Sequence, residues 1–208
     1  MATRLTGVTR LDDDSFEVRF VVPFFYAPPY ASLDLSAPDL ARAPEAWTDG
    51  LHERRARPDA ATGSWRLERT ADVRSLSPTV ISVLTRIQAY AGGAHPNAWF
   101  KVRTWVRDDV SDDARWGRAA RPCDVLAALR RPCDPDRLRR AVIVELERQD
   151  AAWVVAGEVH AGTAWLLDPF TVDPTGLTFR YAAYEVGPYA QGPFEAHVPF
   201  TALASDGR

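Results

Sequence analysis

Alternation of apolar and polar side chains over residues 65–106 is the feature that most constrains the fold of this chain. Side chains of a β-strand point alternately to its two faces, so a period of two predicts strands rather than helices. Apolar residues occupy one face of each of two expected strands, at Trp65, Leu67, Ala71 and Val73 in the first and at Ile81, Val83, Ile87 and Ala89 in the second. We expect residues 79–106 to form an antiparallel hairpin with Gly92-Gly93 at its tip.

The strand expected at residues 99–106 carries an unusual mixture on its odd-numbered face, which consists of Trp99, Lys101, Arg103 and Trp105. Lysine and arginine are rarely fully buried, whereas an ordinary solvent-facing strand seldom carries two tryptophans. Either helices cover the tryptophans while the cations extend to solvent, or the face stacks on sugar rings or anchors an acidic loop of a partner. We therefore treat Trp99 and Trp105 as candidate ligand-binding residues.

The remaining elements follow from hydrophobic periodicity and from proline and glycine signals. In chain order they are a strand at 15–25, a helix at 43–56, a charged loop at 107–120, helices at 123–130 and 135–149, and strands at 177–181 and 196–200. Hairpins precede helices in this order, roughly β-α-βββ-αα-ββ. It predicts an α+β fold with a mostly antiparallel sheet and helices packed on it.

The helix expected at 135–149 has a recognisable cap and an apolar stripe. Asp134 precedes it and is a suitable N-cap residue. The stripe consists of Leu138, Val142, Leu146 and Gln149, at the spacing typical of a half-buried helix. No linker, repeat or low-complexity segment divides the sequence. We expect a single domain over residues 1–208, with a looser N-terminal part at 1–75 and a motif-bearing part at 76–208.

Composition indicates a globular protein and removes several partner classes. Hydrophobic residues make up 46% of the 208 residues, and the formal net charge of -3 gives no electrostatic reason to expect nucleic acid. No apolar run approaches the ~20 residues that span a bilayer, so no membrane insertion is expected. The first residues lack the apolar region of a secretory signal. We expect a cytoplasmic protein or, alternatively, an extracytoplasmic one whose export signal has been removed.

Cys123 and Cys133 lie in a repeated Arg-Pro-Cys-Asp sequence, with a short helix expected between them. A continuous helix over this distance would separate their Cα atoms by ~15 Å, whereas a disulfide tolerates at most ~7 Å. Pro132 interrupts such a helix, so a bridge remains an alternative. We expect free thiols at opposite ends of the helix and no zinc site. A disulfide would instead argue for export.

The standard catalytic signatures are absent from the sequence. It has no Gly-x-Ser-x-Gly elbow, Walker A loop, dinucleotide-binding glycine fingerprint or His-Glu-x-x-His helix. The histidines are scattered, at His52, His95, His160 and His197. We therefore predict no catalytic residues, no metal and no cofactor, and we lean towards a protein that is not an enzyme.

The segment from Tyr90 to Asn97 has the pattern of a shaped turn at the end of a strand. Gly92 and Gly93 permit positive φ angles and close backbone approach, and a residue before proline is held extended, which fixes His95. Two interpretations remain open. Either His95 hydrogen-bonds a neighbouring carbonyl within a hairpin turn, or the loop contacts a ligand through Tyr90, Gly92, Gly93, His95 and Asn97.

The segment from Tyr184 to Pro193 is the second unusual loop. Its backbone is fixed by Gly187, Pro188, Gly192 and Pro193. Its candidate contact residues are Tyr184, Glu185, Tyr189 and Gln191. Either the tyrosines hold a long loop onto the sheet, or they form a binding surface, for which tyrosine offers a large area at small entropic cost.

Together the two loops resemble a known module. The sequence Tyr-Ala-Gly-Gly-Ala-His-Pro at 90–96, the helix start at Asp124, the run over 176–192 and the closing Val-Pro-Phe at 198–200 are similar to the C-terminal domain of RsiV-type anti-sigma factors. The same module accompanies some peptidoglycan deacetylases. The resemblance implies an extracytoplasmic α/β module that, in the anti-sigma factors, binds lysozyme as a stress signal. No sigma-binding segment, transmembrane helix or deacetylase domain is present, so we expect neither of those activities.

The leading hypothesis is a non-enzymatic binding module for a cell-wall-associated partner, either a lysozyme-like protein or peptidoglycan glycan. The alternative from another class is an enzyme of unknown reaction that uses His95 and Glu185 as acid and base. A further alternative is a structural accessory domain. A closed pocket holding His95 and Glu185 would favour the enzyme, whereas an exposed Tyr/Trp surface would favour binding. The sequence does not give an oligomeric state.

Overall fold

The structure of the chain is a computed structural model. It describes residues 2–11, 16–25, 65–77, 79–90, 94–107 and 116–203. The expected helix at 43–56 and the pair Gly92-Gly93 lie outside the described residues. Two compact units are present, Met1–Asp72 with Thr85–Ala98, and Val73–Leu84 with Trp99–Arg208. Each unit is described below by itself.

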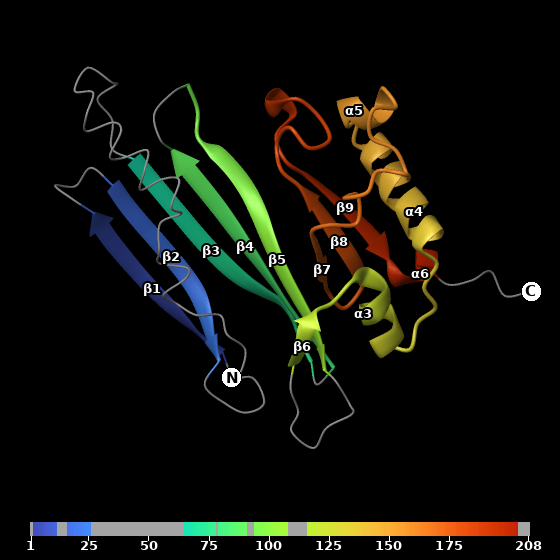
Figure 1. Cartoon of the computed structure of the whole chain (residues 1–208), viewed down its shortest axis with the longest axis horizontal. Helices are drawn as coiled ribbons and strands as arrows, with labels where there is room; N and C mark the ends of the chain where they lie inside the picture. The colour runs from blue at the N-terminus through green and yellow to red at the C-terminus, as the bar shows by residue number, and fades with distance from the viewer. Residues whose placement is uncertain are drawn as a thin grey trace, which may run out of the picture. The chain divides into compact units, whose positions relative to one another are not determined.

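Nine strands form two sheets in the described part of the chain (Figure 1). The six-stranded sheet has the order β1-β2-β3-β4-β5-β6, and its strands are Ala2–Leu11, Phe16–Phe25, Trp65–Leu76, Val80–Tyr90, Asn97–Arg107 and Trp116–Ala119. The three-stranded sheet has the order β7-β8-β9, with strands Phe170–Val172, Gly176–Tyr181 and Phe194–Pro199. Helices are α3 (Pro122–Ala128), α4 (Pro135–Arg148), α5 (Ala152–Val155) and α6 (Phe200–Leu203). The fold is therefore α+β, as the sequence predicted.

The first unit contains the strand pairs β1–β2 and β2–β3. Strand β2 pairs with β1 in antiparallel fashion, with Ala2 opposite Phe25. It pairs with β3 in parallel, with Phe16 opposite Trp65. A parallel pair needs a crossover connection rather than a tight turn, and residues 26–64 provide a long enough connection. The sheet is thus not wholly antiparallel, and β1 is a strand that the periodicity did not predict.

The expected hairpin at residues 79–106 is confirmed in its strands. Arg107 N donates to Thr79 O at 2.9 Å, and the Ser82 and Thr104 hydroxyls lie 2.9 Å apart. The residue numbers of these pairs rise on one strand as they fall on the other, which is the antiparallel pattern. Residues 80–88 and 99–105 are strand throughout. Strand β6 follows in the segment that was expected to be loop, where Trp105 lies opposite Ala119.

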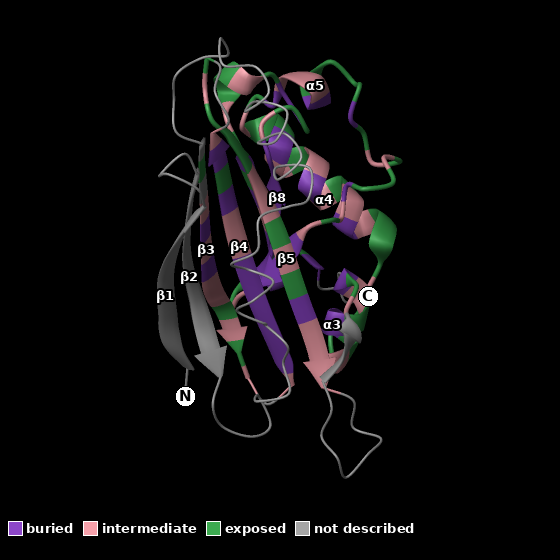
Figure 2. Ribbon diagram, turned by 60° about the vertical axis from the view of Figure 1, so that its left-hand side comes forward, coloured by how far each residue is buried: buried purple, intermediate pink, exposed green. Residues whose placement is uncertain are grey.

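The core of the second unit lies between helix α4 and the β7-β8-β9 sheet. Leu138, Val142 and Leu146 are fully buried on the predicted stripe of α4, which Figure 2 shows as a buried stripe along the helix. The odd-numbered face of β8, with Leu177, Phe179 and Tyr181 at 0% exposure, belongs to the same core cluster. Asp134 caps α4 as predicted, because its carboxylate accepts from the backbone of Asp136 and Arg137.

The prediction of free cysteines was wrong, because Cys123 and Cys133 form a disulfide with a Cα–Cα distance of 5.4 Å. Helix α3 ends at Ala128, and Arg130 adopts a left-handed φ of 55°. Arg131 N then donates to Leu126 O at 2.8 Å, so the chain turns back on the helix. The expected Cα–Cα separation of the two cysteines assumed that the chain continued along the helix axis. Because the chain turns back after Ala128, the two cysteines are instead close enough to form a bridge.

Candidate functional site

The loop between β8 and β9 is held in place by its own buried residue. Val186 is fully buried in the core cluster, and its carbonyl accepts from Trp153 N of α5 at 3.1 Å. The backbone doubles back just before it, where Tyr184 N donates to Gly187 O at 3.1 Å. Residues 182–192 are therefore a fixed part of the second unit, joined to α5.

Gln191 joins the same loop to α5 through its side chain. Its Oε1 accepts from Ala152 N at 3.1 Å, and its Nε2 donates to Asp150 O at 2.9 Å. A Cβ at Gly187 would lie 2.2 Å from Gln191 Oε1, so a larger residue at 187 would push the Gln191 amide out of its present position. Gln191 was a candidate ligand contact, but the structure gives both ends of its amide a structural partner.

Tyr184 presents its ring to solvent from a strained backbone. Its φ is 72°, a left-handed conformation that costs a non-glycine residue roughly 1–2 kcal/mol. The side chain is nevertheless 55% exposed. Its ring meets that of half-buried Tyr189, with centroids 5.7 Å apart and planes inclined by 35°. The loop thus displays an aromatic pair rather than burying it.

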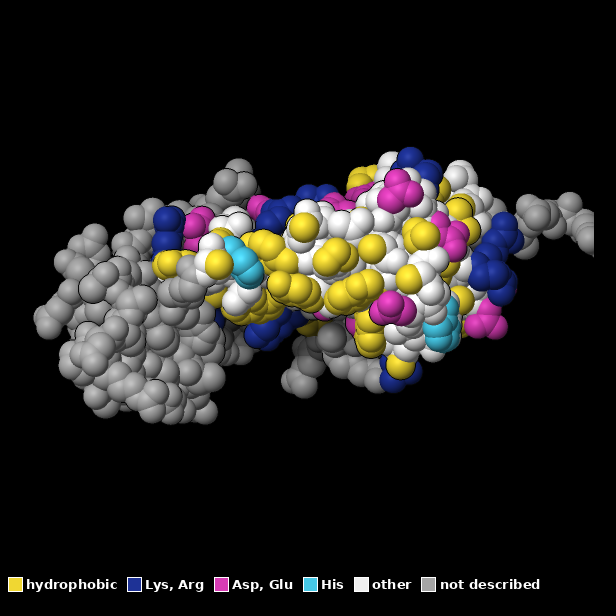
Figure 3. All heavy atoms as spheres, turned by 90° about the horizontal axis from the view of Figure 1, so that it is seen from above, with side chains coloured by type: hydrophobic (Ala, Val, Ile, Leu, Met, Phe, Trp, Pro, Cys, Tyr) yellow, Lys and Arg dark blue, Asp and Glu magenta, His cyan; other side chains and the backbone are white. Residues whose placement is uncertain are grey.

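Further apolar side chains are exposed on segments joined to this loop. Trp165 is 40% exposed and packs edge-on against buried Tyr181, with centroids 6.1 Å apart. Val155, at the end of α5, is 63% exposed. We call Tyr184, Tyr189, Trp165 and Val155 the aromatic surface. Figure 3 looks onto the end of the second unit where α5 lies, and hydrophobic side chains gather there.

The segments that carry the aromatic surface contain carboxylates and no lysine or arginine, although Arg139 of α4 donates from Nη1 to Thr163 O at 2.7 Å. Residues 150–168 and 181–194 contain Asp150, Glu158, Asp168 and Glu185 but no lysine or arginine, although the whole chain has 25 of these cations. Glu185 accepts a 2.6 Å hydrogen bond from Ala182 N. Burial raises the pKa of Glu185 above its ordinary value, and that hydrogen bond opposes the shift. Burial, with the charges of Glu185 and Asp168, also raises the pKa of Tyr181.

The other predicted loop belongs to the first unit. Tyr90 ends β4 half-buried, Asn97 begins β5 exposed, and His95 between them is half-buried. The His95 Nδ1 atom lies 3.2 Å from Pro96 O, which is the neighbouring-carbonyl contact of the first interpretation. This loop and the aromatic surface lie in different units, so the pairing of His95 with Glu185 as acid and base stays a prediction.

The odd-numbered face of β5 is neither core nor open surface. Trp99 and Trp105 are half-buried, whereas Lys101 and Arg103 are exposed. Trp105 lies beside β6 through its pairing with Ala119. Both interpretations of this face therefore remain.

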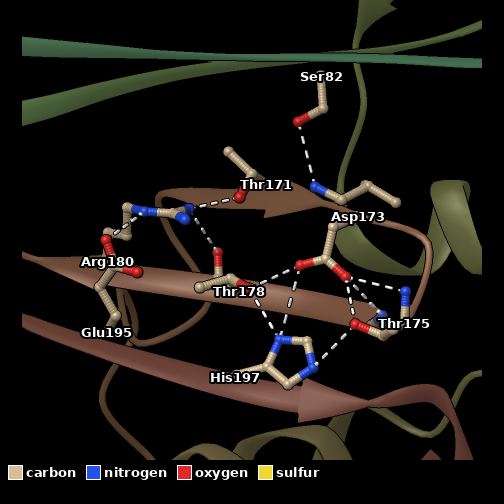
Figure 4. A network of polar contacts seen from close by, with 10 residues as sticks. Ser82, Thr171, Asp173, Thr175, Thr178, Arg180, Glu195 and His197 are labelled. Carbon is tan, nitrogen blue, oxygen red and sulfur yellow. Dashed lines mark hydrogen bonds and ion pairs between the residues drawn. The ribbon is translucent and has the colours of Figure 1, made fainter. Parts of the chain in front are cut away.

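Sequence reasoning missed a polar cluster on the β7-β8-β9 sheet. Thr178 of β8 pairs with Thr171 on one side and His197 on the other. The Asp173 carboxylate and the Thr175 hydroxyl, from the turn after β7, reach the same histidine (Figure 4). Arg180 lies on the same face with 1% side-chain exposure and donates from Nε to Glu195 Oε1 at 2.9 Å.

Both hydroxyls of this cluster lie within hydrogen-bond distance of the Asp173 carboxylate. Thr178 is buried, with 5% exposure, and the Thr175 hydroxyl donates to Asp173 Oδ1 at 2.6 Å. A hydroxyl that already donates to a carboxylate is not activated by the histidine beside it. Among the described residues, no group of three or more His, Cys, Asp or Glu side chains has the arrangement of a metal site. No helix among them is long and apolar enough to span a membrane.

Comparison with known proteins finds a family model that is similar to part of the chain. Residues 137–201 match the family model described as "Protein of unknown function (DUF3298)". The match covers α4 to the start of α6 and so includes the aromatic surface and the His197 cluster. No curated protein matches the chain.

Solved structures of DUF3298 proteins share the fold over almost the whole chain. A family member from Bacteroides fragilis is 14% identical with a TM-score of 0.55, and the alignment covers 97% of this chain and 90% of that one. A family protein from Pseudomonas aeruginosa is 18% identical with a TM-score of 0.54, and the alignment covers 98% and 92%. At these identities the likeness extends to the fold alone.

Proposed function

We propose that the chain is a non-enzymatic binding module for a cell-wall-associated partner, and that the aromatic surface makes the contact. The observation that carries the proposal is Tyr184, whose exposed ring stands on a left-handed backbone. Glycine would adopt that φ without strain. The strain is offset elsewhere in the fold, and among the described residues the ring contacts that of Tyr189. A displayed side chain held at such a cost is typical of a ligand contact.

Two features support a basic protein, such as a lysozyme-like protein, over a peptidoglycan glycan. The segments that carry the aromatic side chains contribute the carboxylates of Asp150, Glu158, Asp168 and Glu185, and Arg139 of α4 donates to Thr163 O in the same region. Such a surface attracts a cationic partner and repels an acidic one. Tyrosine and tryptophan are also the residues that most often anchor protein interfaces. Sugar stacking on Tyr184 or Trp165 remains the alternative within this proposal.

The disulfide supports an oxidising compartment for this function. Both cysteines of the chain are in the bridge Cys123–Cys133, and disulfides persist mainly outside the reducing cytosol. The extracytoplasmic location is therefore the one we propose, in preference to the cytoplasm. It agrees with a partner in the cell wall.

Calorimetric titration of the whole chain against lysozyme and against soluble peptidoglycan fragments tests the proposal. We expect Tyr184→Gly to lower the affinity at least tenfold, because an aromatic anchor contributes roughly 2 kcal/mol or more, while its stability stays at or above that of the parent. Val144→Ser is the matched control, because Val144 is 61% exposed on α4 and is not one of the four residues of the aromatic surface. Affinity that falls with added salt would indicate the basic protein, and salt-independent affinity the glycan.

Unchanged affinity of Tyr184→Gly and Trp165→Ala for every ligand that binds the parent would refute the aromatic surface as the contact. Absence of binding by the parent to both ligand classes would refute the cell-wall partner itself.

A further inference from the structure

The turn between β7 and β8 is built around one carboxylate. Asp173 Oδ1 accepts from Thr175 N at 2.9 Å, from Gly176 N at 3.1 Å and from the Thr175 hydroxyl at 2.6 Å. Its Oδ2 accepts from the Thr178 hydroxyl at 3.2 Å. Burial would raise the pKa of Asp173, but these hydrogen bonds and the charge of His197 outweigh it and lower that pKa. Asp173 is therefore ionised and only accepts hydrogen bonds.

His197, across the ladder on β9, contacts both of the same hydroxyls. Its Nδ1 lies 2.9 Å from the Thr178 hydroxyl oxygen, and its Nε2 lies 3.3 Å from that of Thr175. Nδ1 is also 3.7 Å from Asp173 Oδ2. The ring thus has a hydroxyl at each nitrogen, and each hydroxyl has the carboxylate on its other side (Figure 4).

The number of available protons decides which protonation state of His197 gives both ring nitrogens a hydrogen bond to the two hydroxyls. A threonine hydroxyl has a single proton, and in the closed arrangement both hydroxyls donate theirs to the carboxylate, from Thr175 at 2.6 Å and from Thr178 at 3.2 Å. Each hydroxyl oxygen then faces the ring as an acceptor. Only the imidazolium carries an N–H on both nitrogens, whereas neutral histidine has one. In neutral His197 one ring nitrogen has no proton and faces a hydroxyl oxygen that also accepts. That nitrogen gains a hydrogen bond only if the hydroxyl turns its proton away from Asp173 and towards the ring.

We propose that His197 is a proton-operated clamp on the β7–β8 turn, closed when both ring nitrogens are protonated. The clamp also reaches the start of α6, because Thr175 O accepts from Phe200 N at 2.9 Å. Loss of the proton from Nε2 breaks the contact with the Thr175 hydroxyl and loosens Thr175, and with it the attachment of Phe200. This device does not depend on the proposed binding function.

The charged groups that face His197 in the described part of the chain come from the turn after β7, from α4 and from β9 itself. Asp173 lies nearest. Glu145 of α4 is held ionised by its hydrogen bond from Arg148, and the charge of His197 lowers its pKa further. On β9 itself, Glu195 is paired with Arg180 of β8. The sign of the effect follows. The clamp is lost as pH rises and His197 releases its proton, and it is lost in strong acid when Asp173 is protonated.

Native-state amide exchange of the whole chain between roughly pH 5 and pH 8, the range in which histidine titrates, tests the clamp. After division by the intrinsic rates, the protection of Gly176 N and Phe200 N should fall about 2- to 10-fold as pH rises, the value of one lost hydrogen bond. His197→Gln should abolish that dependence. His160→Gln is the control, because His160 Nδ1 accepts from Gly162 N in a separate turn, and it should leave both amides unchanged.

Nitrogen NMR of the His197 ring in the parent provides a readout that needs no variant. We expect N–H signals on both nitrogens when the clamp is closed and on one nitrogen when it is open. A ring that stays singly protonated at the acidic end, or protection at Gly176 and Phe200 that does not change with pH, would overturn the proposal. Persistence of the pH dependence in His197→Gln would do the same.

Discussion

The hydroxyls of Ser82 and Thr104 lie 2.9 Å apart and together satisfy the backbone of a third strand. Val172 N donates to the Ser82 hydroxyl at 3.2 Å, and the Thr104 hydroxyl donates to Phe170 O at 3.3 Å. The proton order is therefore fixed, with Ser82 donating to Thr104. Both residues are buried. Strand β7 lies at the edge of its own sheet, and the two hydroxyls take the place of a neighbouring strand.

Removing either hydroxyl should destabilise the fold. Ser82→Ala leaves the buried Val172 N–H without its acceptor, and Thr104→Val leaves Phe170 O without its donor. An unsatisfied buried group costs about 1–3 kcal/mol, and chemical denaturation measures that loss. Because both hydroxyls belong to one chain of hydrogen bonds, the double variant should lose less than the sum of the single losses. Thr201→Val, at an exposed threonine of α6, should change little. Strict additivity of the two losses would contradict the relay.

The disulfide should be detectable and stabilising. Thiol titration under denaturing, non-reducing conditions should find essentially no free thiol, since both cysteines are bridged. Replacing both by serine should cost about 2–3 kcal/mol of unfolding free energy, because a short closed loop constrains the unfolded chain. The native turn should persist in that variant, since Arg131 N still bonds Leu126 O. Two free thiols in the untreated protein would contradict the bridge.

The elements that the sequence predicted well are long and regular. Helix α4 has fourteen residues, an aspartate cap and a stripe that repeats every fourth residue, so its signal exceeds that of any competing pattern. Strand β7 has three residues and α5 has four, which is less than the length over which a period can be recognised. The turn at Arg130 was missed because its left-handed φ occurs at a residue with no preference for it.

The sequence indicated several residues of the candidate site but not the contacts that these residues make. Tyr184 and Tyr189 were recognised because aromatic residues between glycines and prolines stand out in any sequence. Gln191 has partners 41 and 39 residues away, so nothing local distinguishes its structural role from a ligand contact. His197 likewise meets Thr178 and Thr175 only across the β8–β9 ladder. The one local signal was the Asp173-Pro-Thr-Gly sequence, which is typical of a turn closed by an aspartate side chain.

Alanine substitution of the tryptophans on β5 decides between the two interpretations of that face. Both side chains are half-buried, so we expect Trp99→Ala and Trp105→Ala each to lose about 1–2 kcal/mol, below the 3–5 kcal/mol of a full core position. Lys101→Ala, exposed on the same face, is the control. A larger loss at Trp105 would indicate that it is part of the core. Parent-like stability together with parent-like binding of every cell-wall ligand would eliminate the stacking platform.

Glu185 should lower stability at neutral pH while serving the proposed surface. Burial raises the pKa of its carboxyl in the folded state, so the folded chain holds this proton to higher pH than the unfolded chain. Folding stability therefore falls as pH rises through the interval between the two pKa values, and the loss is complete above the folded value. Glu185→Gln retains an acceptor for Ala182 N and removes the charge of a carboxyl that is partly desolvated although its residue is exposed. We expect it to be more stable than the parent at neutral pH and equal to it in acid, as measured by urea unfolding at several pH values. Glu158→Gln, at an exposed carboxylate, is the control for the loss of one negative charge.

If a basic partner binds the aromatic surface, the same Glu185→Gln variant should bind it more weakly, so that stability and affinity move in opposite directions. A variant that is less stable than the parent at neutral pH would show that the carboxylate is stabilised rather than strained by its surroundings.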